Sequence, residues 1–295
     1  MTFKRLINGF RDFQNEYFKS DSDLFEKLVN DGQSPEALVI ACSDSRIDPA
    51  ILTRSEPGDI FSVRNVAAMV PPYTADTRYH GTSSAIEYAV KALKVKYIIV
   101  MGHQHCGGIR ALAQSPDTEE DEDSFIQQWI SIGRRARKAV HSILEDSSED
   151  EQLRALEQSS ILVSLNNLLS FPWVREAVEA GHLHLHGWYF DMTHGKLLGY
   201  NPETMHFEDI LKSQNLPAIS TSHAYGYGCE SVTLALPRFL NQLRDTPLPE
   251  ATLEKKPQRN RLPLKDRLKQ FACTCAASST MGLEEISPLI AAGLV

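Results

Sequence analysis

Short apolar runs alternate with stretches of helical periodicity along most of the chain. Apolar runs bounded by turn residues are typical of strands, and they predict strands at 37–41, 60–63, 97–101, 182–190 and 196–200. Apolar residues spaced three and four apart predict helices between them, at 81–93, from 107 onward, at 124–144 and over 153–180 with a break at Pro172. This alternation indicates the α/β class, with a mainly parallel central β-sheet flanked by helices.

The two ends of the chain depart from this alternation. Residues 1–31 carry aromatic and aliphatic side chains at helical spacing, with charged residues between them. We predict that they form two amphipathic helices, which meet near 20–23 and pack on a neighbouring subunit. After about residue 210 the pattern weakens, and 247–265 is rich in proline and charge. We therefore predict one main domain over residues 1–209, N-terminal helices included, and a C-terminal extension over residues 210–295.

Composition excludes several classes of protein. The chain has 30 basic and 38 acidic residues, and its formal net charge of -8 argues against a surface for nucleic acid. No apolar stretch reaches the roughly 18 residues that a membrane span needs, and the N-terminal pattern lacks the apolar core of a secretory signal. Five cysteines, an odd number, disfavour a disulfide framework. We predict a cytoplasmic protein whose reduced thiols are available for a metal.

Two polar motifs follow two of the predicted strands. Cys42 and Asp44 come directly after 37–41, and His103 and Cys106 come directly after 97–101. Ligands of parallel sheets gather at the carboxyl ends of strands, so the fold brings these side chains together. Thiolate and imidazole are ligands that zinc prefers. The motifs predict one zinc ion per subunit, with Asp44 as a further candidate ligand.

Asp44 decides between two kinds of zinc site. As a permanent fourth ligand it would exclude water, and the protein would be a non-catalytic, zinc-stabilised scaffold. Arg46 offers another partner, because a guanidinium can hold a carboxylate through two parallel hydrogen bonds. Asp44 would then leave a position on the metal for water. In that case a hydroxide on zinc is the nucleophile, and Asp44 orients it.

Other groups of potential metal ligands give a weaker signal. The histidines at 182, 184 and 186 alternate along a predicted strand, with no acid or cysteine nearby to complete a site. We interpret them as part of a packed or interfacial face rather than a second metal site. Cys273 and Cys275 form a Cys-x-Cys pair without a matching second half, which favours a surface thiol pair.

Further short segments, spread over roughly residues 1–205, complete the pattern. They are Ala41-Cys-Ser-Asp-Ser-Arg46, Glu56-Pro-Gly-Asp59, Val63-Arg-Asn-Val-Ala67, Val70-Pro-Pro-Tyr73, Ala85-Ile-Glu-Tyr-Ala89 and Gly102-His-Gln-His-Cys-Gly-Gly108. Together they resemble the β-class carbonic anhydrases, in particular the plant-like subgroup. One bacterial subgroup with a regulatory bicarbonate site has a tryptophan where this chain has Val39, so we do not expect bicarbonate inhibition of that kind.

The resemblance implies an activity and the residues that carry it. The activity is the zinc-dependent, reversible hydration of carbon dioxide to bicarbonate and a proton. Cys42, His103 and Cys106 are the implied zinc ligands, and Asp44 and Arg46 are the implied dyad that gates the metal. Hydrolysis of carbonyl sulfide or carbon disulfide on the same scaffold stays open as an alternative, as does the zinc-stabilised scaffold.

The resemblance also implies a substrate pocket and an assembly. Gln33 is in the position of a glutamine that helps to hold substrate. A small apolar pocket around the metal is implied for Phe61, Val66, Tyr88 and Gly107. Part of this pocket comes from a neighbouring subunit in the family, which implies a homodimer or a higher even oligomer.

Overall fold

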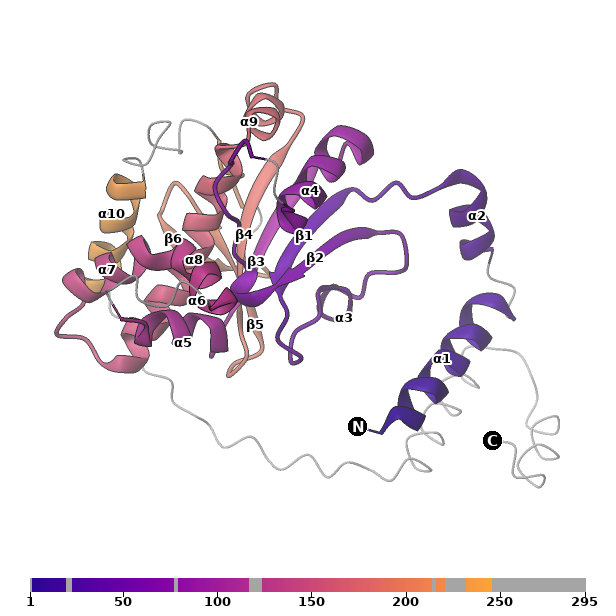
Figure 1. Cartoon of the computed structure of the whole chain (residues 1–295), viewed down its shortest axis with the longest axis horizontal. Coiled ribbons are helices and arrows are strands. Elements are labelled where there is room, and N and C mark those ends of the chain that lie inside the picture. The colour runs from indigo at the N-terminus through magenta and orange to yellow at the C-terminus, as the bar shows by residue number, and fades with distance from the viewer. Residues whose placement is uncertain are drawn as a thin grey trace. The chain divides into compact units, whose positions relative to one another are not determined.

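A six-stranded sheet organises the part of the chain that the structure describes. This computed structural model describes residues 2–19, 23–76, 79–116, 124–213, 216–220 and 232–245. The strands are β1 (Ala37–Cys42), β2 (Ile60–Asn65), β3 (Tyr97–His103), β4 (His184–Asp191), β5 (Lys196–Asn201) and β6 (His206–Asp209). Their order is β2-β1-β3-β4-β5-β6 (Figure 1). The first four strands in this order are parallel and the last two are antiparallel, which confirms the predicted mainly parallel sheet.

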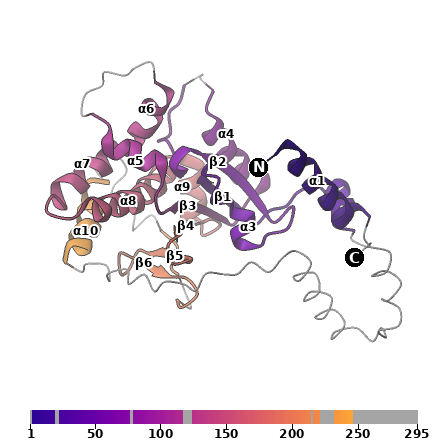
Figure 2. The same cartoon turned by 90° about the horizontal axis from the view of Figure 1, so that it is seen from below.

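Helices connect and flank these strands. They are α1 (Phe3–Phe18), α2 (Leu24–Asp31), α3 (Pro49–Thr53), α4 (Gly81–Glu87), α5 (Gly107–Gln114), α6 (Phe125–Ile130), α7 (Arg134–Ile143), α8 (Glu149–Leu169), α9 (Pro172–Glu179) and α10 (Val232–Asp245). Figure 2 shows α5, α7, α8 and α10 grouped beside one another. None of the helices in the described residues has the length and apolar content that crossing a membrane requires.

The strands β1 and β3 are buried on both faces, which explains their unbroken apolar sequences. On one face, Leu38 and Val100 belong to a core cluster that includes residues of α4, α8 and α9. On the other face, Val39 and Met101 form a smaller cluster, against which Leu52 of α3 packs. The central strands therefore have little freedom to shift, and their carboxyl ends are fixed in space.

Helix α8 approaches the sheet closely where two strands carry glycine. A Cβ atom at Gly102 or at Gly187 would lie 2.8 Å from side-chain carbons of Ile161. Such a contact is too short for any real Cβ atom, so only glycine permits this packing distance. The middle of α8 is thereby held against β3 and β4.

The predicted helix over 124–144 is divided, because a 3-10 turn at Ser131–Gly133 separates α6 from α7. A Cβ atom at Gly133 would lie 2.5 Å from Leu112 Cδ2. The glycine in this turn therefore allows α5, which carries Leu112, to pack closely against it. Similarly, the predicted helix over 81–93 ends in a π-helical segment, Tyr88–Leu93. The sequence patterns identified these regions as helical but gave no sign of the irregular turns.

The N-terminal helices have apolar faces that the same chain covers poorly. Neither α1 nor α2 contains a buried residue, and Phe3 and Phe10 are 77% and 63% exposed. The rings of Phe13 and Phe25 meet edge to face at 5.5 Å between the two helices. Two helices in this region confirm the sequence pattern, while their packing on a neighbouring subunit stays a prediction.

The chain divides into two compact units, residues 1–247 and residues 248–295. The first unit contains α10, whose Leu236, Phe239 and Leu240 belong to a buried cluster with side chains of α7 and α8. Most of the predicted linker at 247–265, with Cys273 and Cys275, belongs to the second unit, and all of it lies outside the described residues. The division after residue 209 stays a prediction.

Candidate metal centre

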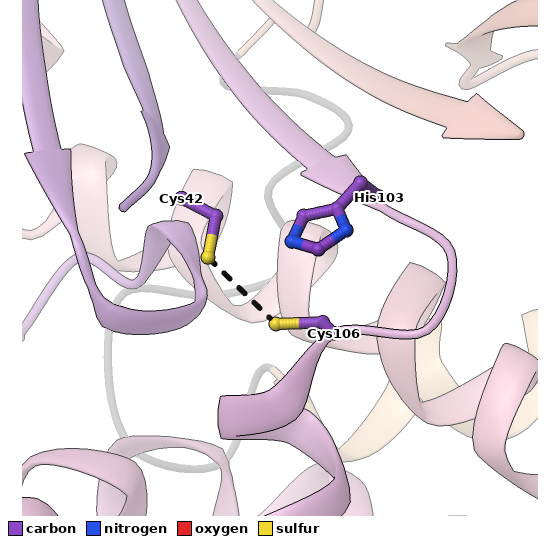
Figure 3. A group of neighbouring side chains, drawn as sticks. All are labelled: Cys42, His103 and Cys106. Atoms are coloured by element: carbon purple, nitrogen blue, oxygen red, sulfur yellow. Dashed lines mark hydrogen bonds between the residues drawn. The ribbon is translucent and has the colours of Figure 1, made fainter. Parts of the chain in front are cut away.

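The predicted zinc ligands lie at the ends of neighbouring elements. Cys42 is the last residue of β1, and His103 is the last residue of β3, the adjacent parallel strand. Cys106 is the N-cap residue of α5, which begins one turn after β3 ends. Figure 3 shows the two sulfur atoms facing each other, with the imidazole beside them. The fold thus brings together two sequence motifs that are separated by 61 residues from Cys42 to His103.

The distances in this cluster suit a tetrahedral zinc ion. The Sγ atoms of Cys42 and Cys106 are 3.9 Å apart. Two thiolates bound to one tetrahedral zinc at about 2.3 Å would have sulfur atoms about 3.8 Å apart. One ligand atom from each of the three residues lies within 4.8 Å of the others, and all three side chains are buried. The donor set and its spacing therefore fit the metal that the sequence predicts.

The imidazole of His103 is oriented for a metal. Its Nδ1 atom lies 2.9 Å from the carbonyl oxygen of Gln104, to which it donates a hydrogen bond as Nδ1–H. This hydrogen bond leaves the lone pair on Nε2. Nε2 is buried and has no hydrogen-bond partner within the described part of the chain. A buried nitrogen lone pair without a partner carries an energetic cost that coordination to a metal would remove.

The pKa values of the two thiols are shifted in opposite directions. The hydrogen bond with Cys106 lowers the pKa of the Cys42 thiol to about 4, and burial opposes this shift. The hydrogen bond with Cys42, together with burial, raises the pKa of the Cys106 thiol. A divalent cation would replace the proton held between the two sulfur atoms, since only thiolates bind metals strongly.

Asp44 lies beside the cluster and is held by Arg46. Arg46 donates from Nε to Asp44 Oδ1 at 2.9 Å and from Nη2 to Oδ2 at 2.6 Å. Its backbone N–H also donates to Oδ1, at 2.9 Å. These hydrogen bonds hold the pKa of the Asp44 carboxyl well below its usual range. Oδ2 lies 3.9 Å from Nε2 of His103, so the carboxylate is near the ligands while Arg46 binds both of its oxygens.

His105 contributes to this arrangement through its backbone. Its φ of 57° is in the left-handed region, which is unusual for a residue other than glycine. The conformation presents the carbonyl oxygen of His105 to Arg46 Nη2, at 2.9 Å. The loop between the two metal-ligating residues of the second motif is therefore tied to the dyad of the first.

Comparison with known proteins agrees with this geometry. The profile of the carbonic anhydrase family matches residues 37–197. The chain is 36% identical over 198 residues to a carbonic anhydrase of Synechocystis sp., which is 67% of this chain and 71% of that protein. The chain belongs to the β-carbonic anhydrase family. It is also 40% identical over 189 residues to the chloroplastic β-carbonic anhydrase 5 of Arabidopsis thaliana, and the match covers 64% of this chain but 62% of that relative.

Solved structures of other β-carbonic anhydrases have the same fold. The β-carbonic anhydrase CcaA superposes with a TM-score of 0.67 at 33% identity, covering 74% of this chain and 96% of that one. A tetrameric β-carbonic anhydrase of Sordaria macrospora gives a TM-score of 0.54 at 31% identity, covering 66% and 92%. The Coccomyxa enzyme, solved in complex with acetazolamide, gives 0.58 at 29% identity, covering 66% and 85%. The α/β class and the family predicted from the sequence are confirmed.

Arg64 fixes the segment that carries the first motif. Its guanidinium donates to the carbonyl oxygens of Cys42, Asp44 and Ile47, at 3.1, 2.8 and 2.6 Å from Nη2. It also forms an ion pair with Asp48 at 2.9 Å. Sequence reasoning did not single out Arg64. The sequence signal that could have identified Arg64 is its position directly after a predicted strand close to the strand that ends at the predicted ligand Cys42.

Glu157 is a second residue that sequence reasoning missed. This carboxylate of α8 accepts a hydrogen bond from the backbone N–H of Cys106 at 3.1 Å and another from the hydroxyl of Tyr189 at 2.7 Å. It is 3% exposed, and burial raises its pKa. A single acid in the long, otherwise uncharged stretch from residue 155 to residue 169 is the signal that could have identified it.

Of the residues predicted to surround the substrate, some contact one another or adjoin Cys106, and Gln33 lies apart from them. The rings of Phe61 and Tyr88 lie 5.8 Å apart, and Val66 packs against Gly108, where a Cβ atom would lie 2.7 Å from Val66 Cγ1. Gly107 begins α5 beside the predicted metal ligand Cys106. Gln33 lies exposed between α2 and β1, and no hydrogen bond joins it to the metal ligands among the described residues. Their roles in binding substrate stay predictions.

The histidines of β4 do not form a second metal site in the described part of the chain. His184 and His186 instead lie beside the ring of Tyr97, at 5.8 and 6.2 Å between ring centroids. The pKa of the His186 imidazole is lowered, mainly by burial and to a smaller extent by the neighbouring His184. His184 and Tyr97 are exposed in the single chain and His186 is half-buried, so the interpretation as a packed or interfacial face stays a prediction.

Proposed function

We propose that this protein catalyses the reversible hydration of carbon dioxide to bicarbonate and a proton, with one zinc ion held by Cys42, His103 and Cys106. The observation that carries the proposal is the position of Asp44, whose two oxygens are taken by Arg46 beside three buried, convergent ligands. When bound, zinc would lower the pKa of a water molecule so that hydroxide is available near neutral pH.

The dyad supports a catalytic site rather than a zinc-stabilised scaffold. A carboxylate engaged by a guanidinium on both oxygens is a poor fourth ligand, so three protein ligands leave one position open. The low pKa of Asp44 keeps it ionised. Its remaining lone pairs accept a hydrogen bond from the reacting water and orient that water toward the substrate.

The surroundings of the site suit an uncharged, weakly polar substrate. Phe61 pairs with Leu38, four residues before Cys42 in β1, and its ring lies beside Tyr88, so we propose that the apolar surface of Phe61, Val66 and Tyr88 lines a substrate pocket that is completed between subunits. Val66 and Tyr88 are 37% and 49% exposed in the single chain. We propose that a second subunit covers them, that Gln33 contributes a hydrogen bond to substrate, and that the active form is a homodimer or a higher even oligomer.

The apolar face of α1 supports this assembly. Exposed phenylalanine side chains on a helix with no buried residue are costly in water, and burial against a partner removes that cost. The related Sordaria macrospora proteins are described as tetrameric. A cytoplasmic location stays a prediction from the sequence.

Stopped-flow measurement of carbon dioxide hydration by the zinc-loaded full chain tests the proposed activity. We expect saturable hydration that disappears when zinc is removed and returns when it is restored. Carbon disulfide and carbonyl sulfide serve as comparison substrates under the same conditions. With stoichiometric zinc bound, hydration no faster than the buffer at alkaline pH would exclude the proposal.

A further inference from the structure

Three helices line a partly open cavity that is separate from the predicted metal ligands. Its volume is about 570 Å³, within the range of pockets that hold small organic ligands. Each helix contributes one face: Arg110 and Gln114 lie on α5, Lys138 and His141 lie on α7, and Leu153 lies on α8. The spacings of three and four residues in α5 and α7 place these side chains on the same side of each helix.

Positive charge predominates in this cavity. Arg110, Arg137 and Lys138 line it together with His141, and Glu149 is the acidic side chain among the lining residues. Arg137 also donates to the carbonyl oxygen of Ser115. Arg110 and Lys138 have no carboxylate partner in the described part of the chain. A cluster of this sign is unexpected in a protein with a formal net charge of -8.

The lining combines cationic groups with apolar surface. Val140, Leu153 and Leu156 are buried side chains that line the cavity beside the charged groups. Guanidinium and ammonium groups bind phosphate and carboxylate oxygens, while the aliphatic surface suits the carbon skeleton of a ligand. Bicarbonate, with one charge and four heavy atoms, would leave most of the cavity empty.

From these observations we propose that the cavity binds a small organic anion with at least two negative charges, either a phosphate ester or a polycarboxylate. Arg110 and Lys138 supply the charge that selects it. This proposal concerns a site other than the metal centre, and its binding test does not depend on the activity proposed above.

Two hydrogen bonds connect the walls of the cavity with the metal centre. The backbone N–H of Arg110 donates to the carbonyl oxygen of Cys106 at 2.9 Å. On α8, Leu156 precedes Glu157, which accepts the hydrogen bond from the backbone N–H of Cys106. An anion held between Arg110 of α5 and Lys138 of α7, against Leu156 of α8, would therefore act on the helix that begins at the proposed zinc ligand Cys106. The bound anion is thus an effector that changes turnover.

Calorimetric titration of the zinc-loaded full chain tests the binding site. The probes are inorganic phosphate, glucose 6-phosphate and citrate, each compared with chloride at equal ionic strength. We expect saturable binding of at least one organic probe, with inorganic phosphate weaker because it lacks a carbon skeleton. Tighter binding of glucose 6-phosphate would assign the phosphate-ester class, and tighter binding of citrate would assign the polycarboxylate class.

Substitutions at the cavity identify the site. Arg110→Met and Lys138→Glu should each weaken binding of the preferred probe about tenfold or more, because each removes a charged hydrogen bond. Lys212→Glu, the same change of charge at an exposed residue outside the cavity lining, should leave the affinity unchanged. Melting temperature and zinc content, measured without probe, identify any variant that does not fold.

Two results would overturn the proposal. The cavity is not an anion site if no probe binds saturably, or if the cavity variants bind as tightly as the parent protein. The effector role is wrong if saturating probe leaves the hydration rate of an active enzyme unchanged. A change in rate that Arg110→Met abolishes, while Lys212→Glu retains it, would support both parts.

Discussion

The metal centre and the N-terminal helices differ in how far contacts within one chain bury their side chains. The predicted ligands Cys42, His103 and Cys106 are 5%, 1% and 2% exposed, and hydrogen bonds from the same chain fix the segments that carry them. In contrast, α1 contains no buried residue, and its Phe3 and Phe10 are more than half exposed. One chain therefore buries all three predicted ligands, whereas it leaves the apolar face of α1 exposed.

This comparison makes a general prediction. Substitutions at the metal centre should alter zinc content and turnover without first altering assembly. Substitutions on the exposed face of α1 should alter assembly while each chain keeps its zinc.

Removing a ligand should have the largest effect. In Cys106→Ala, the remaining thiolate and imidazole do not hold zinc stoichiometrically, so hydration should fall to the uncatalysed rate. Unfolding should also become easier, because a metal present at a thousandfold excess over its Kd stabilises the native state by about 4 kcal/mol. Elemental analysis, stopped-flow kinetics and thermal unfolding measure the three effects.

Cys229→Ala is the matched control for this experiment. It removes a thiol outside the proposed ligand set, so zinc content and turnover should remain those of the parent. Stoichiometric zinc in Cys106→Ala would contradict the assigned ligands.

The second prediction concerns the dyad. Arg46→Ala should lower turnover about 10- to 100-fold, as is usual for partners that orient groups at a metal, while most of the zinc remains bound. Without Arg46, the pKa of Asp44 should rise toward the ordinary value of about 3.9, and the carboxyl remains ionised near neutral pH. Raising the pH should therefore not restore the rate, since orientation and not charge has been lost.

Kinetics across pH and zinc analysis distinguish the outcomes for the dyad. Asp44→Asn should show a similar loss of turnover, since its amide cannot accept from Arg46 in the same way. Full activity in Arg46→Ala would remove the dyad from the proposed mechanism.

The convergence of Cys42, His103 and Cys106 was predictable because strong local signals and a general rule coincide. Short apolar runs before Cys42 and before His103 admit few structures other than buried strands. Neighbouring parallel strands then place their carboxyl ends at the same edge of the sheet. No knowledge of side-chain packing is needed for this step.

Other parts of the site depend on contacts that a single sequence does not encode locally. Glu157 reaches the backbone of Cys106 only because α8 packs closely on Gly102 and Gly187. Arg64 lies in β2, and its long side chain donates hydrogen bonds to the carbonyl oxygens of Asp44 and Ile47 in the segment after β1. Helix α10 was missed for another reason, since Pro237 lies within it and the surrounding pattern is weak.

The third prediction tests the N-terminal helices. Phe10→Ser should weaken subunit association, because each buried phenylalanine contributes about 2 kcal/mol and a symmetric dimer loses two of them. Sedimentation equilibrium should show a lower average mass at low protein concentration. Zinc content per chain should not change.

Asn15→Ser provides a control on the same helix, at an exposed polar position. It should leave the mass unchanged. Equal association of Phe10→Ser and the parent would mean that the face of α1 is not an interface.

The smallest expected effect is on stability, at the loop after β4 that hydrogen bonds of Asp191 hold in place. Asp191, which is 7% exposed, accepts hydrogen bonds from the backbone N–H of His194 at 3.0 Å and from its Nδ1 at 2.7 Å. Burial raises the pKa of Asp191, but the hydrogen bonds with His194 outweigh burial and the net pKa is lowered. Thr193 in the same loop donates to Gln104, the residue after His103, so this loop supports the metal centre.

A lowered pKa in the folded state fixes the sign of the pH dependence. The stabilisation from Asp191 is fully present above its unfolded pKa of about 3.9, and it is lost as the pH falls through the lower folded pKa. Asp191→Asn should be less stable at neutral pH by about 1 to 2 kcal/mol, and its stability should fall less steeply in acid. Denaturant unfolding between neutral and acidic pH measures both effects. Asp12→Asn, on exposed α1, should follow the parent curve, and parallel curves for Asp191→Asn and the parent would show that this carboxylate does not brace the loop.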